Sequence, residues 1–387
     1  MEDFAKGPKV FFVYNDKRFR YLLEKLKVEL NLIGIFYVGI SWKELFFWTN
    51  LISCALEMIY ASIKKGHFVR INKRMLYVNS TRRPNLIKEM SSKVQKKIDS
   101  MKVKPDLVLQ TSSMFATYIQ TPNVPFALII DNYADPPNST NQKDKLRGWS
   151  TLYDASYYRF QKQIYSTALC IFTFSKWCKE GLSKEYNIDP EKIRPIGWGP
   201  AREIEPTCGT SKKDDKTILC VGNDYVAKGF DVLVKSAKYL QDFSITIVGR
   251  DDRRALKNLD IPRNVQILNY VSNEKLYSLY SKSELFFIFS EFDPSPHVLW
   301  EAQANGCVVI GYDAYGISEA VINNKTGILL KTRDPLFVAE QIRKLYEEKG
   351  NIKSMREAAI ENYKKNGTWD GVCKTIACEL QSAFSNT

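Results

Sequence analysis

The sequence predicts an α/β protein of two domains, each with a doubly wound parallel sheet. The first observation is length, because 387 residues exceed what a single ordinary hydrophobic core holds. The second is that short, wholly apolar runs recur along the chain and alternate with helical patterns, as buried parallel strands and their crossover helices do. The third is a hydrophobic content of 44%, which is typical of globular chains and excludes disorder.

In the first half, apolar runs predict five strands, with a helix before the last of them. We expect strands at residues 9–14, 32–38, 106–110, 126–131 and 169–175, and a helix at 151–167. Asp131 ends the fourth strand, and open α/β sheets bind ligands at that edge, so Asp131 is a candidate catalytic residue. A capping role in the turn before Ala134-Asp-Pro-Pro137 is the alternative.

The most apolar helix candidate runs from Trp42 to Lys65. Its short length and Glu57 in its middle argue against a membrane span. It either packs inside the protein or lies in a membrane interface. Clustered basic residues behind it favour the membrane, since they attract anionic lipid. These residues are Lys64, Lys65, Arg70, Lys73, Arg74, Arg82 and Arg83.

The net charge of +13 belongs to the first half of the chain. Residues 1–200 hold 31 Lys and Arg against 18 Asp and Glu, while residues 201–387 hold 25 of each kind. This asymmetry indicates an anionic partner, which is a membrane surface, a phosphorylated acceptor or nucleic acid. A coat of solvated lysines without a partner is the alternative.

Cysteine and histidine usage indicates a reducing compartment and no metal site. The eight cysteines form no C-x-x-C pair, and several lie in apolar runs, so we expect reduced core residues in the cytoplasm. Only two histidines are present, which disfavours a histidine-based metal centre. The polar start Met1–Pro8 runs straight into a strand, so we expect no signal peptide.

In the second half, the alternation of strands and helices continues. We expect strands at residues 217–222, 244–249, 265–270, 285–290 and 307–311. Helices are expected at 273–283, from about 297 to 306, at 335–348 and from about 368 onward.

The turn after residues 285–290 carries the strongest signal for a site. A helix begins near His297, so its free N–H groups face the loop and suit an anion. Asp293 lies in the loop and Glu301 one turn into the helix, with seven residues between them. Carboxylates beside a phosphate site accept hydrogen bonds from hydroxyls, so the pattern indicates a phosphorylated, hydroxyl-rich ligand such as a nucleotide sugar. The alternative is that Asp293 caps the helix and Glu301 is a surface acid.

The spacing of Asp293 and Glu301 resembles the paired-acid motif E-x7-E of retaining GT-B glycosyltransferases of family 4, the glycosyl transferases group 1. Gly316-Ile-Ser-Glu319 and Asn324-Lys-Thr-Gly-Ile-Leu-Leu330 resemble that family's G-x-x-E and T-G-x-L segments. The resemblance covers roughly residues 150–385 well and the first 150 poorly. It implies two facing Rossmann-like domains with an interdomain cleft.

The segment from Gly222 to Gly229 resembles the family's phosphate loop, G-R-x-x-x-x-K-G. Lys228 matches the lysine that neutralises the donor pyrophosphate, and an ordinary loop lysine is the alternative. Asn223 replaces the usual arginine, and Arg250 is a candidate substitute.

Domain boundaries follow from the resemblance and from composition. Gly197 and Gly199 lie in a segment that resembles the G-x-G-P hinge, where the backbone approaches the ligand. We expect an acceptor-side domain at 1–200, a linker at 201–216, a nucleotide-sugar domain at 217–367 and a helix at 368–387 that crosses back to the first domain. Further donor contacts implied by the resemblance come from Tyr270, Val271, Ser295, Pro296, His297 and Val298.

The resemblance implies sugar transfer from a UDP- or GDP-sugar, with retention of configuration and without a metal or other cofactor. Lys228 and the helix start would hold the pyrophosphate, Glu301 the ribose hydroxyls and Asp293 the sugar hydroxyls. We expect a peripheral protein on the inner face of the membrane, a lipid-linked acceptor and no nucleic acid. The alternative is a degenerate GT-B-fold binding protein that docks on membrane or nucleic acid without catalysis, which the arginine-to-asparagine change at Asn223 supports.

Overall fold

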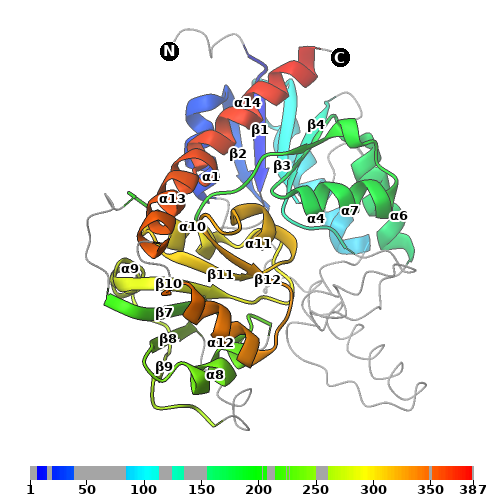
Figure 1. The fold of residues 1–387 in the computed structure, drawn as a ribbon. Helices are drawn as coiled ribbons and strands as arrows, with labels where there is room; N and C mark the ends of the chain where they lie inside the picture. The colour runs from blue at the N-terminus through cyan, green and yellow to red at the C-terminus, as the bar shows by residue number, and fades with distance from the viewer. Residues whose placement is uncertain are drawn as a thin grey trace, which may run out of the picture. The chain divides into compact units, whose positions relative to one another are not determined.

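The computed structural model describes residues 7–14, 20–38, 84–112, 124–134, 155–202, 204–206, 214–223, 225, 227–249, 260–347 and 351–385. The apolar helix predicted at Trp42–Lys65, the basic residues behind it and Arg250 lie outside these ranges. The chain divides into two compact units (Figure 1). The first holds residues 1–174, 178–196 and 373–387, and the second holds 175–177 and 197–372.

The first unit contains a six-stranded parallel sheet in the order β2-β1-β3-β4-β5-β6. Every residue of β3 and β4 is buried, which confirms the prediction from their apolar runs. The strands are β1 (Val10–Tyr14), β2 (Leu32–Tyr37), β3 (Leu107–Thr111), β4 (Phe126–Ile130), β5 (Ile171–Thr173) and β6 (Ile193–Pro195). The helices are α1 (Arg20–Glu29), α4 (Pro84–Asp99), α6 (Ala155–Thr167) and most of α7 (Lys176–Tyr186) and of α14 (Trp369–Ser385), with a short 3-10 turn at Pro190–Lys192. No helix among the described residues has the length and apolar character needed to cross a membrane.

The second unit also contains a six-stranded parallel sheet, in the order β12-β11-β10-β7-β8-β9. This is the strand order of a dinucleotide-binding doubly wound fold, and the order reverses between β7 and β10. The strands are β7 (Asp214–Gly222), β8 (Ser244–Gly249), β9 (Val265–Leu268), β10 (Ser283–Ile288), β11 (Val308–Tyr312) and β12 (Gly327–Leu330). The helices are α8 (Phe230–Ser236), α9 (Asn273–Lys282), α10 (His297–Ala304), α11 (Tyr315–Ala320), α12 (Pro335–Lys344) and α13 (Asn351–Asn366), with a 3-10 turn at Ala237–Tyr239.

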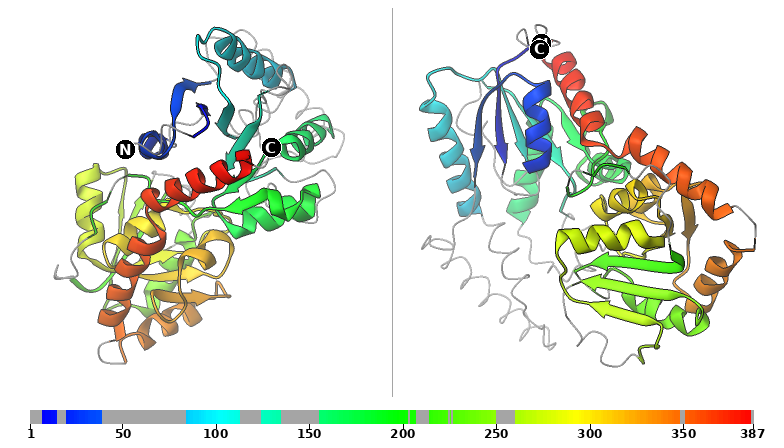
Figure 2. Two further views of the ribbon diagram at one scale, coloured as in Figure 1. Left: turned by 90° about the horizontal axis from the view of Figure 1, so that it is seen from above. Right: turned by 90° about the vertical axis from the view of Figure 1, so that its left-hand side faces the viewer.

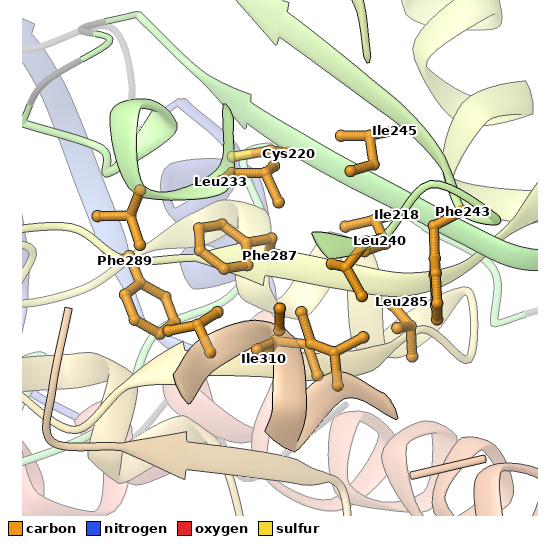
Figure 3. Packing of buried hydrophobic residues seen from close by; sticks show 14 of the residues in the cluster. Ile218, Cys220, Leu233, Leu240, Phe243, Ile245, Leu285, Phe287, Phe289 and Ile310 are labelled. Atoms are coloured by element: carbon orange, nitrogen blue, oxygen red, sulfur yellow. The ribbon is translucent and has the colours of Figure 1, made fainter. Parts of the chain in front are cut away.

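Strand β10 is covered by helices on both faces of its sheet (Figure 2). Leu285 and Phe287 point into a large apolar cluster that includes residues of α8 and α12 (Figure 3). Phe286 points the other way, where its ring lies 5.7 Å from that of Tyr280 of α9. Phe289 continues the cluster beyond the strand and stacks on Phe287 with ring centroids 4.4 Å apart. Each buried phenylalanine contributes roughly 1.5–3 kcal/mol, so the loop after β10 starts from a firmly anchored point.

The described residues of the segment predicted as a linker, at 201–202, 204–206 and 214–216, fall in the second unit. β7 begins at Asp214, three residues before the predicted start at Thr217. The prediction missed these residues because they are charged and exposed, as the residues of a linker are. Ile204 is buried, and its carbonyl accepts a hydrogen bond of 3.1 Å from the Tyr363 hydroxyl of α13. The residues before this segment, from Gly197, and those directly after it belong to the second unit as well. Helix α13 itself was not among the predicted elements.

Candidate functional site

The carboxyl ends of β7 and β10 meet at the reversal point of the second sheet. The two strands pair in parallel, so the loops after them leave from the same edge. The Glu291 N–H donates a hydrogen bond of 2.8 Å to the Ala227 carbonyl, which ties the loop after β10 to the loop after β7. Doubly wound folds bind their ligands at this position.

Lys228 and Asp293 form an ion pair across these two loops. Their side chains are only 27% and 15% exposed, so water screens the pair incompletely. Gly222 leaves room for the lysine, because a Cβ there would lie 2.8 Å from the Lys228 Cγ. The structure thus joins the cation and the acid that the sequence predicted separately, and Lys228 is not an unpaired loop lysine.

The backbone of the Asp293 loop is held by α11. The Gly316 N–H donates to the Asp293 carbonyl at 3.2 Å. A Cβ at Gly316 would lie 2.2 Å from the Pro294 carbonyl oxygen, so only glycine allows this approach. Phe292 packs against Tyr315 with ring centroids 4.9 Å apart. These contacts fix the direction in which the Asp293 side chain points.

Helix α10 begins without a side-chain cap. Its N-cap is Pro296, and no side chain accepts a hydrogen bond there, so Asp293 is not a helix cap. Ser295 and Pro296 are buried, whereas His297 and Val298 are half-buried. Because proline has no N–H, the first donors of the helix belong to His297 and Val298, and the helix dipole adds partial positive charge there.

Gly199, one of the two predicted hinge glycines, lies against the start of α10. The His297 Nδ1 is 2.6 Å from the Gly199 carbonyl oxygen. A Cβ at Gly199 would lie 2.7 Å from the Trp369 ring, whose N–H donates to the Pro200 carbonyl at 2.8 Å. Gly197 adopts a φ of +75°, which glycine reaches without strain.

Glu301 is buried in α10 and faces Arg202. Its side chain is 2% exposed, which excludes the reading as a surface acid. The Arg202 Nε lies 3.6 Å from the Glu301 Oε1. Burial first, and then the Glu301 carboxylate, raise the pKa of Tyr280 well above its ordinary value. The sequence did not point to Arg202, which lay in the predicted linker.

The other predicted site residues are more dispersed. Asn223 and Tyr270 are exposed, and Val271 is half-buried after β9, which β7 and β8 separate from β10. Glu319 accepts hydrogen bonds of 2.8 and 2.9 Å from the backbone N–H groups of Lys176 and Trp177, which belong to the same unit. Asp131 follows β4 in the first unit and is half-buried.

The fold and this site define a class of protein. The second unit carries a lysine–acid pair and a helix start at the reversal point of a doubly wound sheet, an arrangement suited to a phosphorylated ligand. Residues 202–366 match the model of the family described as glycosyl transferases group 1. This match covers most of the second unit and less than half of the chain.

Curated relatives carry related names but are longer than the match. The chain is 24% identical over 229 residues to an uncharacterized glycosyltransferase of Methanocaldococcus jannaschii, covering 53% of this chain and 57% of that protein. It is 24% identical over 222 residues to a D-inositol 3-phosphate glycosyltransferase of Corynebacterium diphtheriae, covering 50% of this chain and 52% of that protein. The chain thus spans about half the length of the curated relatives it matches.

Solved structures share the fold over nearly the whole chain. A glycosyltransferase from Rickettsia africae aligns with a TM-score of 0.68 and 17% identity, covering 98% of this chain and 100% of that chain. A sucrose-phosphate synthase from Thermosynechococcus elongatus aligns with a TM-score of 0.70 and 12% identity, with the same coverage of both chains. The Anabaena protein HepE, in complex with UDP-glucose, aligns with a TM-score of 0.62 and 13% identity, covering 97% of this chain and 100% of that chain. The described fold is therefore the GT-B fold of glycosyltransferases.

Proposed function

We propose that the protein is a glycosyltransferase that moves a sugar from a nucleoside-diphosphate sugar to an acceptor. The Lys228–Asp293 ion pair at the reversal point of the second sheet carries this proposal. A cation for phosphate and a carboxylate for hydroxyls stand together there, beside the uncapped start of α10. The family of residues 202–366 and the UDP-glucose complex of HepE support the same donor class.

The chemistry follows from the charges of these groups. Lys228 and the first N–H groups of α10 bind the pyrophosphate and stabilise the negative charge that develops on the leaving group. Asp293 accepts hydrogen bonds from hydroxyls of the transferred sugar, and Glu301 accepts them from the ribose. Pyrophosphate binding draws Lys228 toward the phosphate, which leaves the Asp293 carboxylate available to the sugar.

Binding of the donor is tested by thermal unfolding with UDP and GDP. One of the two should raise the melting temperature in a concentration-dependent way, because a ligand of the native state stabilises it by mass action. If neither nucleotide changes the melting temperature, the result contradicts the proposed donor class and favours the alternative of a binding protein built on this fold.

We further propose that the anomeric configuration is retained and that no metal is needed. Lys228 and the α10 start supply the positive charge that a divalent cation supplies elsewhere. Transfer should therefore persist in EDTA, and the product anomer should match that of the donor sugar. Loss of transfer in EDTA, restored by manganese, contradicts the metal-independent part.

For the acceptor, we propose a lipid-linked glycan precursor at an anionic membrane surface. Residues 1–200 carry the whole net charge of +13, and α4 and the turn after it expose Lys96, Lys97, Lys102 and Lys104. Each basic residue near an anionic surface contributes about 1 kcal/mol, so several together give reversible attachment.

Co-sedimentation with vesicles of increasing anionic lipid content tests this membrane contact. Binding should weaken with salt and with reversal of Lys96, Lys97 and Lys102 to glutamate. Reversal of the exposed Lys275 of the second unit is the matched control and should leave binding unchanged. If the protein stays in the supernatant at low salt, the result contradicts the membrane contact and favours a soluble acceptor.

A further inference from the structure

Tyr315, the first residue of α11, adopts a backbone conformation that tyrosine rarely takes. Its φ is +54°, in the left-handed region, where a residue with a Cβ is strained and glycine is not. Strained residues of this kind persist where the surrounding structure holds them, and they gather at functional sites. A glycine would adopt this backbone conformation at lower cost, so the tyrosine contributes through its side chain.

The Tyr315 ring belongs to an aromatic cluster, formed with Trp177 and Phe292, that lies beside Asp293. The centroid of the Tyr315 ring is 4.9 Å from that of Phe292 and 5.4 Å from that of Trp177. The Phe292 and Trp177 rings are 5.2 Å apart, so each ring contacts the other two edge to face. This geometry is favourable beyond the apolar area that it buries. Because Phe292 directly precedes Asp293, the aromatic cluster restrains the backbone on the amino side of the acid.

Helix α11 restrains the same acid from its carboxyl side. Gly316, the second residue of α11, donates its N–H to the Asp293 carbonyl oxygen at 3.2 Å. The conformation of a residue sets the direction of the next N–H, so the left-handed turn before Gly316 and this hydrogen bond belong together. One turn further along α11, the Glu319 carboxylate accepts two backbone N–H groups, one of them that of Trp177 at 2.9 Å. This bond holds the backbone that carries the Trp177 ring of the aromatic cluster.

We propose that Tyr315 is a positioning residue that holds Asp293 for sugar transfer, with the aromatic cluster as its support. This inference rests on the proposed function, in which Asp293 accepts hydrogen bonds from the transferred sugar. Tyr315 acts on both sides of the acid, through the aromatic cluster before it and through the Gly316 N–H that bonds its carbonyl. A small displacement of a group that orients the reacting sugar slows the reaction strongly. Lys228 and the start of α10, which bind the pyrophosphate in the proposed function, belong to other elements, so loss of the ring should leave nucleotide affinity unchanged.

The first test replaces Tyr315 by leucine, which removes the ring and keeps an apolar side chain. With the nucleotide sugar that the unmodified protein cleaves fastest, kcat for release of the nucleoside diphosphate should fall at least about tenfold. The dissociation constant of UDP or GDP, measured by isothermal titration, should change by less than about twofold. Tyr315→Phe keeps the ring and should keep kcat, so an equal loss in both variants overturns the assignment to the ring. Tyr315→Gly, which relieves the left-handed backbone, is judged in the same way if the leucine variant does not fold.

The second test asks whether Tyr315 acts through Asp293. Asp293→Asn should slow release by itself, because it removes the carboxylate that the ring positions. Adding Tyr315→Leu to Asp293→Asn should then slow release by less than about a further twofold, since two residues that act as a unit have non-additive effects. Losses that multiply fully overturn the inference, because they mark two residues that act independently.

Tyr346→Leu is the matched control for both tests. Tyr346 belongs to the same unit, and its ring meets that of Phe243 edge to face, with centroids 5.3 Å apart. Its hydroxyl donates to the Glu284 carboxylate at 2.7 Å, near the amino end of β10 and so at the edge of the sheet opposite to the Asp293 loop. This variant should lower the melting temperature but keep kcat and nucleotide affinity. A fall in kcat as large as that of Tyr315→Leu overturns the inference, because it marks a general effect of lost aromatic packing.

The outcomes separate this inference from the proposed function. If the unmodified protein releases the nucleotide and Tyr315→Leu releases it equally fast, the inference fails and the proposed function stands. If the unmodified protein releases nucleotide from no donor, the inference and the proposed function fail together.

Discussion

Replacing Lys228 by alanine removes the cation of the Lys228–Asp293 pair while leaving the β7 loop its length. The lysine contacts Asp293 across the reversal point, and its side chain is 27% exposed. The change should weaken nucleotide binding and should also cost some stability, since Asp293 is only 15% exposed and loses its partner.

The size of the binding effect follows from the charge on both partners. A hydrogen bond to a charged group contributes roughly 1.5–3 kcal/mol, which corresponds to a roughly 10- to 150-fold weaker dissociation constant. Leaving Asp293 unpaired should lower the free energy of unfolding by about 1–3 kcal/mol, because some water still reaches the carboxylate.

Isothermal titration with UDP or GDP measures the binding effect, and urea unfolding measures the stability. Lys235→Ala is the matched control, because Lys235 of α8 pairs with Asp231 at 3.7 Å and is 49% exposed. Its effect on stability should stay within about 0.5 kcal/mol, with no effect on nucleotide affinity. Asp293→Asn separates the roles further: it should keep UDP or GDP affinity and reduce sugar transfer.

Two results would refute this reasoning. If Lys228→Ala binds the nucleotide as tightly as the unmodified protein, the lysine does not contact the pyrophosphate. If Lys228→Ala and Lys235→Ala weaken binding equally, the effect is one of general charge and not of the site.

Three further predictions concern stability and reactivity. Gly316→Ala places a Cβ 2.2 Å from the Pro294 carbonyl oxygen, so it should lower the free energy of unfolding in urea by about 1–3 kcal/mol or more. Gly371→Ala is the control, because its Cβ would meet only Thr368 at 3.4 Å, and it should be neutral or stabilising. The hydrogen bond from Lys216 lowers the pKa of Asp242 to about 2, so this carboxylate contributes stability above about pH 4 that is lost as the pH falls toward 2. Because Asp242 is 40% exposed, its contribution to the free energy of unfolding is at most about 1 kcal/mol. In Asp242→Asn, the free energy of unfolding measured with urea should depend less on pH between about pH 4 and 2 than in the unmodified protein. An unchanged pH dependence contradicts this. Burial raises the pKa of the Cys170 thiol to about 12, so iodoacetamide followed by mass spectrometry should label the exposed Cys378 well before Cys170, and equal labelling would contradict the burial.

Local patterns were sufficient to predict most of the strands and the two loops of the site, but not the short strands β6 and β12. The apolar run at residues 285–290 predicted β10, which the structure places at Ser283–Ile288. Lys228 and Asp293 were each predicted from the pattern of their own loop. Because β7 and β10 are parallel neighbours, the loops that follow them lie at the same edge of the sheet. Their direct pairing is a tertiary fact that neither loop encodes alone.

Other features were missed for different physical reasons. Helix α13 does carry a signal, since its buried Ile352, Met355, Ala359, Ile360 and Tyr363 recur at helical spacing within a mostly polar segment. The contact of Arg202 with Glu301 carries no such signal, because polar neighbours around Arg202 resemble a linker and the partner lies in a distant helix. Its discovery required the folded second unit.

The most direct measurement is a screen of nucleotide sugars, scored by release of the nucleoside diphosphate. The unmodified protein and Lys235→Ala should release UDP or GDP from at least one donor in the presence of EDTA. Lys228→Ala and Glu301→Gln should release it at least about tenfold more slowly while unfolding cooperatively. Release from no donor, or equal release by all four proteins, would contradict a donor site at the reversal point of the second sheet.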